Sequence, residues 1–170
     1  MTSTLTKIAT LTAGSGGVAG FTFSSIPQTY TDLKVVCSVR SAAVSGWDSL
    51  SMWPNGVQTT LSNTYLSGNG TTLSSSRGTY RAVATMNTEG TTANTFTNAE
   101  IYIPNYRLSN FKQILVTSTA GSAVAESYGY FTAELWSNTA AITSLLFNTA
   151  TSGLNFVQNS SITLYGIKNS

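Results

Sequence analysis

A period-two pattern of apolar residues constrains this chain more than any other feature of its sequence. The clearest case is residues 33–41. The odd-numbered positions from Leu33 to Val39 are all apolar, and the even-numbered ones are Lys34, Val36, Ser38 and Arg40, so the second face is partly polar. Successive side chains of a β-strand point to opposite faces, so this pattern predicts a strand with one buried face. No segment places its apolar residues at helical spacing. The sequence therefore predicts an all-β fold.

Further short strands are expected along the whole chain, separated by turn residues. The clear ones are predicted at 5–12, 18–24, 50–53, 99–103, 112–118, 127–136, 142–147 and 161–167. The middle, Gln58 to Asn98, is polar and weakly patterned, and we expect it to contribute little to the core. Within it, the Asn69-Gly70 pair predicts a hairpin turn, Tyr80 to Met86 is a weaker strand candidate, and residues 88–98 are expected to form an exposed loop. The Asn55-Gly56 pair is a second hairpin signal.

About ten short strands with regular spacing favour two antiparallel sheets packed face to face, as in a jelly roll or a related sandwich. The last strand is apolar on both faces, which favours a position inside a sheet rather than at its edge. No internal repeat and no linker divides the sequence. Residues 1–170 are therefore predicted to form a single β-sandwich domain.

The chain contains no histidine and a single cysteine, Cys37. Ser–His and Cys–His catalysis and most zinc sites are impossible without histidine. Cys37 lies on the apolar face of its predicted strand, and we expect it to be a small buried residue rather than a reactive thiol. No catalytic, cofactor-binding or metal-binding residue is predicted, and no cofactor.

Six carboxylates remain as candidates for chemistry. Glu100 and Glu134 fall in predicted strands and could be brought together by strand pairing, as a glycosidase would require. A solvated or interfacial role is the preferred interpretation of both. Asp48 with Asn55 is a weak candidate for a calcium site, because calcium needs several oxygen ligands in one loop. The chain is therefore predicted not to be an enzyme.

The eight basic and six acidic residues are scattered singly along the chain. Nucleic-acid binders cluster Lys and Arg on one face, so no nucleic-acid partner is expected. The N-terminus lacks a basic head followed by an apolar core, and no apolar stretch is long enough to span a membrane. We therefore expect neither a signal peptide nor a membrane segment.

Three aromatic residues near the predicted turns are candidates for contact with a glycan or a partner: Trp47, Trp53 and Tyr65. Aromatic rings can stack on sugar rings, and the two Asn-Gly turns would place these residues near the ends of strands. In the alternative interpretation, Trp47 and Trp53 fill the core of the sandwich or a seam between subunits.

Three stretches resemble a family of small structural proteins of tailed-bacteriophage virions. They are Phe21 to Leu33, which contains Ile26-Pro27 and Tyr30; Ile101 to Tyr106; and Ala141 to Ser144 with Asn155-Phe156 and Thr163 to Lys168. These motifs are architectural. We expect Tyr30 to pack across the corner after Pro27, Asp32 to accept backbone N–H groups of a turn, and Tyr165-Gly166 to mark a close approach of two segments.

The resemblance implies a jelly-roll virion protein, and the composition is compatible with this role. Charged residues make up only 8% of the chain against about 25% in typical domains, a composition typical of exposed proteins, yet no export signal is present. A virion component made in the bacterial cytoplasm, and exposed after lysis, would combine both features. We expect a capsid decoration (cement) protein on the virion surface, acting as a homotrimer and binding the major capsid protein or other virion proteins.

Two alternatives remain open. The first is a tail fibre or tail-appendage module that binds host-surface polysaccharide. A fibre subunit normally carries a shaft, whereas the predicted strands of this sequence run from residue 5 to residue 167. The second alternative is a free carbohydrate-binding domain.

Overall fold

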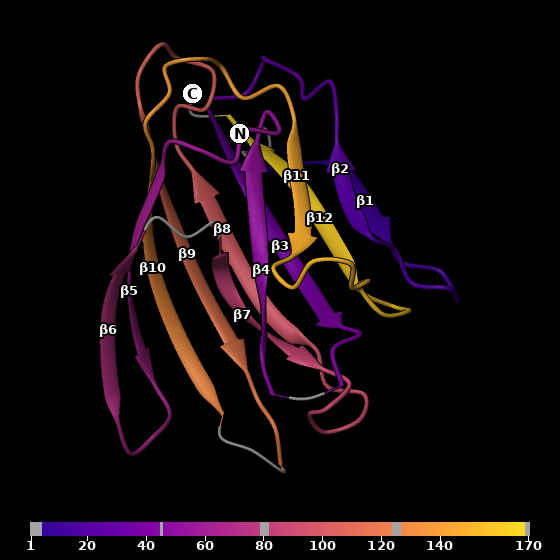
Figure 1. The fold of residues 1–170 in the computed structure, drawn as a ribbon. Helices are drawn as coiled ribbons and strands as arrows, with labels where there is room; N and C mark the ends of the chain where they lie inside the picture. Colours follow the sequence, from indigo (N-terminus) through magenta and orange to yellow (C-terminus); the bar gives the residue numbers. More distant parts are fainter. Residues whose placement is uncertain (1–4, 45, 79–81, 124–126, 169–170) are drawn as a thin grey trace.

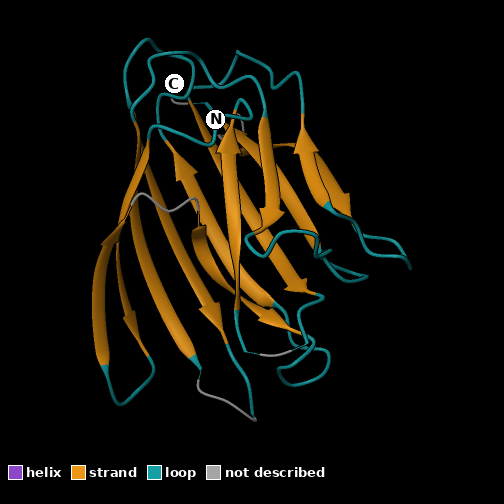
Figure 2. Ribbon diagram, viewed as in Figure 1, coloured by secondary structure: helices purple, strands orange, loops and turns teal. Residues whose placement is uncertain are grey.

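The structure is a computed structural model that describes residues 5–44, 46–78, 82–123 and 127–168. These residues form twelve strands and no helix (Figure 2), and thus no helix that could cross a membrane. The strands are β1 (Leu5–Thr12), β2 (Gly20–Phe23), β3 (Asp32–Ser41), β4 (Asp48–Pro54), β5 (Leu61–Gly68), β6 (Leu73–Gly78), β7 (Ala82–Thr88), β8 (Thr97–Ile103), β9 (Lys112–Ala120), β10 (Tyr128–Trp136), β11 (Leu145–Thr149) and β12 (Ser161–Ile167). The all-β prediction is confirmed.

Hydrogen bonding connects all twelve strands into one mixed, mostly antiparallel sheet that does not close on itself (Figure 1). Eight strands follow one another as β1-β12-β3-β8-β9-β10-β5-β6, and four as β2-β11-β4-β7. The two parts join where β3 pairs in parallel with β7, at Arg40 with Asn87 and Ser41 with Thr88. The two separate sheets of a jelly roll are therefore not confirmed, because β3 carries the ladder from one part into the other.

The core lies between the two parts. On β8 and β9 every second residue is buried, which gives the eight-stranded part an inner face covered by the four-stranded part and an opposite, outer face. β7 packs against β8, β9 and β10 from the inner side. From the four-stranded part, Leu50, Met52 and Phe147 enter the core. Cys37 is buried there as predicted, and burial raises the pKa of its thiol far above the ordinary value.

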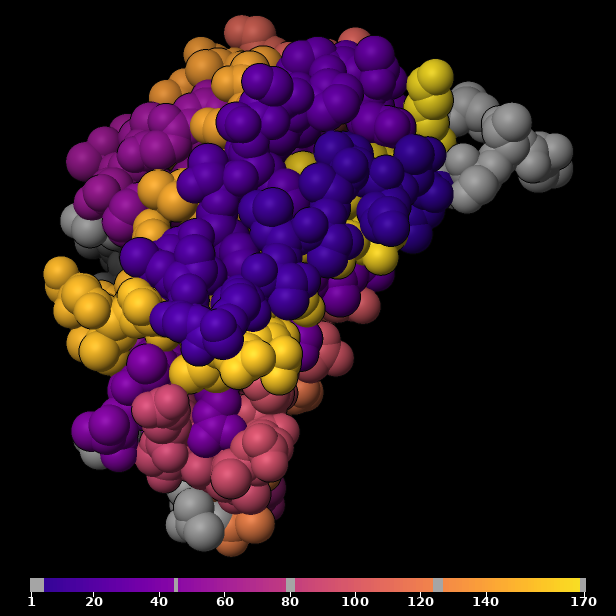
Figure 3. All heavy atoms as spheres, turned by 90° about the vertical axis from the view of Figure 1, so that its right-hand side faces the viewer, coloured from indigo at the N-terminus to yellow at the C-terminus, as the bar shows by residue number. Residues whose placement is uncertain are grey.

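The N- and C-terminal strands lie side by side. β1 and β12 have the bounds that the sequence predicts, and they pair antiparallel from Leu5 with Ile167 to Thr12 with Ser161. Figure 3 shows this face of the molecule, on which the indigo N-terminal segment lies against the yellow C-terminal one. β12 also pairs with β3, so the last strand lies inside the sheet, as expected.

The corner between β2 and β3 has the predicted packing. The ring of Tyr30 lies directly on Gly166, where any Cβ would collide with it. Asp32 accepts the backbone N–H of Asn105 at 2.9 Å and the hydroxyl of Tyr102 at 2.8 Å. The architectural motifs thus join the start of β3 to the ends of β8 and β12.

The polar middle of the chain differs from its prediction. The stretch 58–98 contains all of β5, β6 and β7, and Leu61, Val83 and Met86 are buried in the core. The segment expected as an exposed loop buries Thr91, and Arg40 donates to the carbonyl of Thr92 at 3.0 Å. The prediction that this stretch contributes little to the core is wrong.

The two Asn-Gly pairs have different roles. Asn69-Gly70 forms the β5–β6 hairpin turn, with Gly70 at a φ of 91°. Asn55 and Gly56 also have positive φ, at 52° and 69°, but β4 pairs with β7 and β11 rather than with the following strand. The second pair therefore makes a turn without a hairpin.

Candidate binding site

Four aromatic rings form a continuous row, here called the aromatic ladder, on the inner side of β10 and β5. Trp47 contacts Tyr128 edge-on with ring centroids 5.6 Å apart. Tyr128 lies 5.9 Å from Tyr130, and Tyr130 lies 5.9 Å from Tyr65. All four rings are half-buried. The period-two pattern of β10 positions Tyr128 and Tyr130 on one face, and pairing with β5 brings Tyr65 beside them.

A cavity of about 470 Å³ adjoins one end of the aromatic ladder, between β4 and β7 on one side and β5, β6 and β10 on the other. We call it the inner cavity. Its polar lining is uncharged among the described residues and consists of Ser49, Asn63, Tyr65, Ser76, Thr85, Tyr130 and Thr132. Its apolar lining is Ala82, Val83, Ala84 and Ala150. The Asn63 amide donates to the carbonyl of Ala82 at 3.1 Å, which holds β5 to β7.

Glu134 lies next to the inner cavity on the same face of β10. It pairs in register with Asn63, and its neighbour two residues before is the cavity-lining Thr132. Glu134 is only 1% exposed, and neither carboxyl oxygen has a hydrogen bond of ordinary geometry. Burial raises the pKa of this carboxyl from 4.5 to about 8, and the nearby Asn63 side chain opposes the rise in part. At neutral pH the group is therefore mostly protonated, so it can both donate and accept a hydrogen bond.

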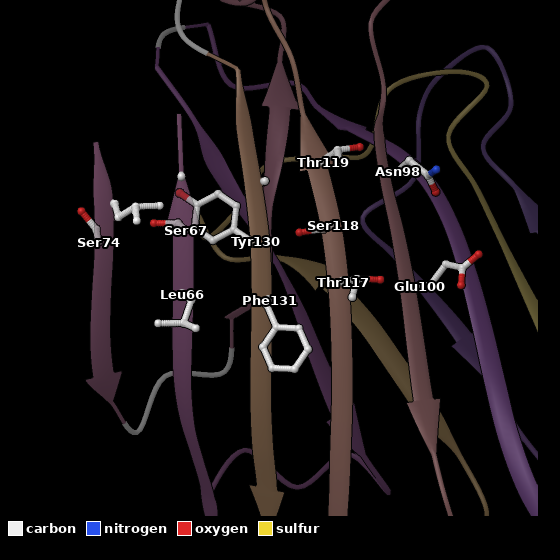
Figure 4. A pocket seen from close by; sticks show the side chains of 13 residues that line it. Leu66, Ser67, Ser74, Asn98, Glu100, Thr117, Ser118, Thr119, Tyr130 and Phe131 are labelled. Atoms are coloured by element: carbon white, nitrogen blue, oxygen red, sulfur yellow. The ribbon is translucent and has the colours of Figure 1, made fainter. Parts of the chain in front are cut away.

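The outer face carries a second concavity, the outer groove, of about 570 Å³ across β6, β5, β10, β9 and β8 (Figure 4). Leu66 and Phe131 pair in register on neighbouring strands and project from the sheet on this side. Leu73 extends the apolar wall, and Gly129 leaves open space over β10. On the other side of the groove Glu100 forms an ion pair with Lys34 at 2.8 Å.

The two carboxylates considered for catalysis lie on opposite faces. Glu100 is on the outer face of β8, whereas Glu134 is buried on the inner face of β10. Strand pairing therefore separates them by the thickness of the sheet instead of bringing them together across a cleft.

The two residues of the weak calcium candidate stand at opposite ends of β4. Asp48 begins β4 and accepts hydrogen bonds from Ser41 and Thr151, whereas Asn55 follows the end of β4 and accepts from the backbone of Thr143. Across the residues that the structure describes, no group of three potential metal ligands comes together.

Of the three aromatic candidates, the structure brings two together. Trp47 and Tyr65 are the two ends of the aromatic ladder, although 18 positions separate them in the sequence. Trp53 lies elsewhere, half-buried on β4 opposite Leu146. Phe131, which follows Tyr130, faces the outer groove and belongs to the other surface.

Sequence reasoning did not assign Tyr130 or Asn63 to a site. Its preferred interpretation of Glu134 as a solvated or interfacial residue is wrong, because Glu134 is buried inside the fold. The alternation of Tyr128 and Tyr130 was the one available signal, because it places both rings on a single face. Nothing in the local sequence distinguishes Asn63 and Glu134 from solvated residues.

Comparisons with protein-family models, curated proteins and solved structures find no match to this chain.

Proposed function

We propose that this chain is a non-enzymatic structural protein of a bacteriophage virion, a capsid decoration protein that binds the shell through its outer face. The observation that supports the proposal is a group of exposed apolar side chains on neighbouring strands of that face. Leu66 is 57% exposed, Phe131 47% and Leu115 39%, and strand register places them on the adjacent strands β5, β10 and β9.

The chemistry of this surface resembles the centre of a protein interface. Contiguous exposed apolar patches on soluble proteins commonly mark interaction sites, and charged residues are depleted from interface centres. Here the charged groups lie at the borders, with Arg77 on the edge strand β6 and the Lys34–Glu100 pair beyond β9. A protein partner with a complementary apolar surface would bury this region.

The proposed mechanism is stabilisation by mass action. A subunit that binds the assembled shell, and not its separated parts, adds its binding free energy to the stability of the shell. Several bound copies multiply the effect, and a homotrimer would present three outer faces at once. Sedimentation velocity at micromolar concentration should therefore show a trimer, and a monomer would contradict this part of the proposal.

Removal of the protein from virions tests the proposed role. Particles that lack it should release DNA at lower temperature, and added wild-type protein should restore their heat stability. Phe131→Ser should fail to restore it, whereas Val44→Ser should succeed, because Val44 is 81% exposed in the β3–β4 loop, outside the outer face. Equal heat stability with and without the protein would contradict the proposal.

A second candidate function, a tail appendage that binds host-surface polysaccharide, is favoured by the aromatic ladder. In that role Tyr65→Ala should reduce adsorption of virions to cells and leave their heat stability unchanged. Trp53→Ala should have little effect, because Trp53 lies outside the ladder. The two roles thus predict opposite outcomes for heat stability and adsorption.

A further inference from the structure

We propose that the inner cavity is a binding site for an uncharged saccharide, with Tyr65 and Tyr130 as the stacking surface and Asn63, Thr132 and Ser49 as hydrogen-bonding groups. The site shares Tyr130 with the outer groove, but its other lining residues are not among those of the groove on which the proposed virion role rests. The inference does not depend on that role, because it concerns the purified chain alone.

The size and walls of the inner cavity fit a small polar ligand. Small-molecule sites typically measure roughly 300–1,000 Å³, and this cavity measures about 470 Å³. Ala82, Ala84 and Ala150 supply small apolar walls. Opposite them, the half-buried rings of Tyr65 and Tyr130 offer larger apolar surfaces whose hydroxyl groups can also bond a ligand.

The polar groups of the cavity select for a ligand with many hydroxyls and no charge. Ser49, Thr132 and the two tyrosines carry hydroxyls that both donate and accept hydrogen bonds, and sugar hydroxyls need partners of this kind. A charged ligand would lose its hydration without gaining an opposite charge from the described lining residues, which is costly. A neutral sugar meets no such penalty.

Glu134 is the second observation that points to a ligand. The Glu134 carboxyl is 1% exposed, and apart from its interaction with the Asn63 side chain neither oxygen has a hydrogen bond of ordinary geometry, which is unusual in a protein interior and costs stability. Glu134 does not itself line the inner cavity, but it pairs in register with Asn63 and lies two residues from Thr132, and both of these residues do line it. A ligand hydroxyl bound at Asn63 would therefore lie close to this carboxyl and could give it a further partner.

Titration of the purified full chain with neutral trisaccharides tests the proposal. The neutral probes are trisaccharides of glucose, galactose, mannose and N-acetylglucosamine, and a galacturonate trisaccharide is the charged comparison. Binding of each probe is measured by calorimetry and by ligand-observed NMR. We expect at least one neutral probe to bind, and every neutral probe that binds to do so more tightly than the charged one.

Variants locate the bound sugar. Tyr65→Ala should weaken binding about three- to tenfold, the value of one aromatic contact. Thr132→Val should weaken binding without changing the volume of the side chain. If Tyr65→Ala does not fold, Tyr65→Phe replaces it in the test. Tyr65→Phe keeps the ring, so its binding should lose only the contribution of the hydroxyl. Phe131→Ala is the matched control, because Phe131 is the neighbour of Thr132 in β10 and faces the opposite side of the sheet. This variant should bind the probes as the wild type does.

Three results would overturn the proposal. The first is no binding of any neutral probe at about 10 mM, where even a site of millimolar affinity is occupied. The second is binding that Thr132→Val and both Tyr65 variants leave unchanged. The third is tighter binding of the galacturonate probe than of every neutral one.

Discussion

At the scale of single residues, Glu134 makes the stability of the protein depend on pH. The pKa of its carboxyl is about 8 in the folded chain, against an ordinary value of 4.5. Between pH 4.5 and pH 8 the folded state therefore holds a proton that the unfolded chain has lost. The contribution of Glu134 to stability is complete below about pH 4.5 and is lost as the pH rises through about 8. Each pKa unit corresponds to about 1.4 kcal/mol, so the loss amounts to several kcal/mol.

Substitution of Glu134 by Gln should remove this dependence. Urea unfolding at pH 5 and pH 8 should show a smaller loss of stability for Glu134→Gln than for the wild type, with the variant more stable at pH 8. Glu100→Gln is the control, because Glu100 is exposed and should leave the wild-type loss intact. An unchanged loss in Glu134→Gln would show that other groups cause the dependence.

Lys112 stabilises two loops from the interior. Its ammonium donates to the carbonyls of Leu108, Asn110 and Ala140 at 2.7–2.8 Å, and to that of Thr139 at 3.3 Å. The side chain is buried beside the ring of Trp136, and burial lowers the pKa of the ammonium. One cation thus joins the turn after β8 to the segment after β10.

Replacement of Lys112 by Met should destabilise the protein by about 2–4 kcal/mol, because it removes the buried cation whose four hydrogen bonds join the two loops. Lys34→Met removes only a partly exposed ion pair with Glu100 and should cost about 1 kcal/mol or less. Chemical denaturation of both variants at pH 7 measures the difference. Similar losses for the two variants would contradict the structural role given to Lys112.

At the scale of elements, the contact between Tyr30 and Gly166 fixes the corner before β3 on β12. Any Cβ at position 166 would overlap the ring, and overpacking of this kind costs about 1–3 kcal/mol. Gly166→Ala should therefore be destabilising, and the loss should shrink when Tyr30 is also replaced by Ala. Gly129→Ala is the control, because open space surrounds that position on β10. If Gly166→Ala caused the same loss of stability in the wild-type background and in the Tyr30→Ala background, the proposed contact would be contradicted.

The sequence predicted most strands because their alternation reports a buried face and an exposed face. β1 and β12 match in both bounds, and β8 and β9 begin within two residues of the prediction. The contribution of the middle strands β5 and β6 was underestimated for a physical reason. The inner positions of β5 face the inner cavity at Asn63 and Tyr65, and β6 is an exposed edge strand, so neither carries the apolar periodicity of a core strand.

At the scale of the whole molecule, two features lay outside the reach of the sequence. The parallel pairing of β3 with β7 joins residues nearly fifty positions apart over only two pairs, and no local signal marks it. The aromatic ladder likewise depends on how β4, β5 and β10 come together. Periodicity predicts which face of a strand is buried, but it does not predict which strands become neighbours.

The arrangement of the two surfaces makes a final prediction, because both depend on the same two strands. Leu66 and Phe131 line the outer groove and not the inner cavity, Tyr65 lines the inner cavity and not the outer groove, and Tyr130 contributes to both. Since adjacent residues of a strand point to opposite faces, a substitution on one face leaves the other in place. Phe131→Ser should lose binding to the shell and keep binding to a neutral trisaccharide, and Tyr65→Ala should do the reverse. Particle co-sedimentation and calorimetry on the same preparations measure both. If each variant lost both activities, the cause would be disruption of β5 and β10, and the assignment of separate roles to the two faces would be wrong.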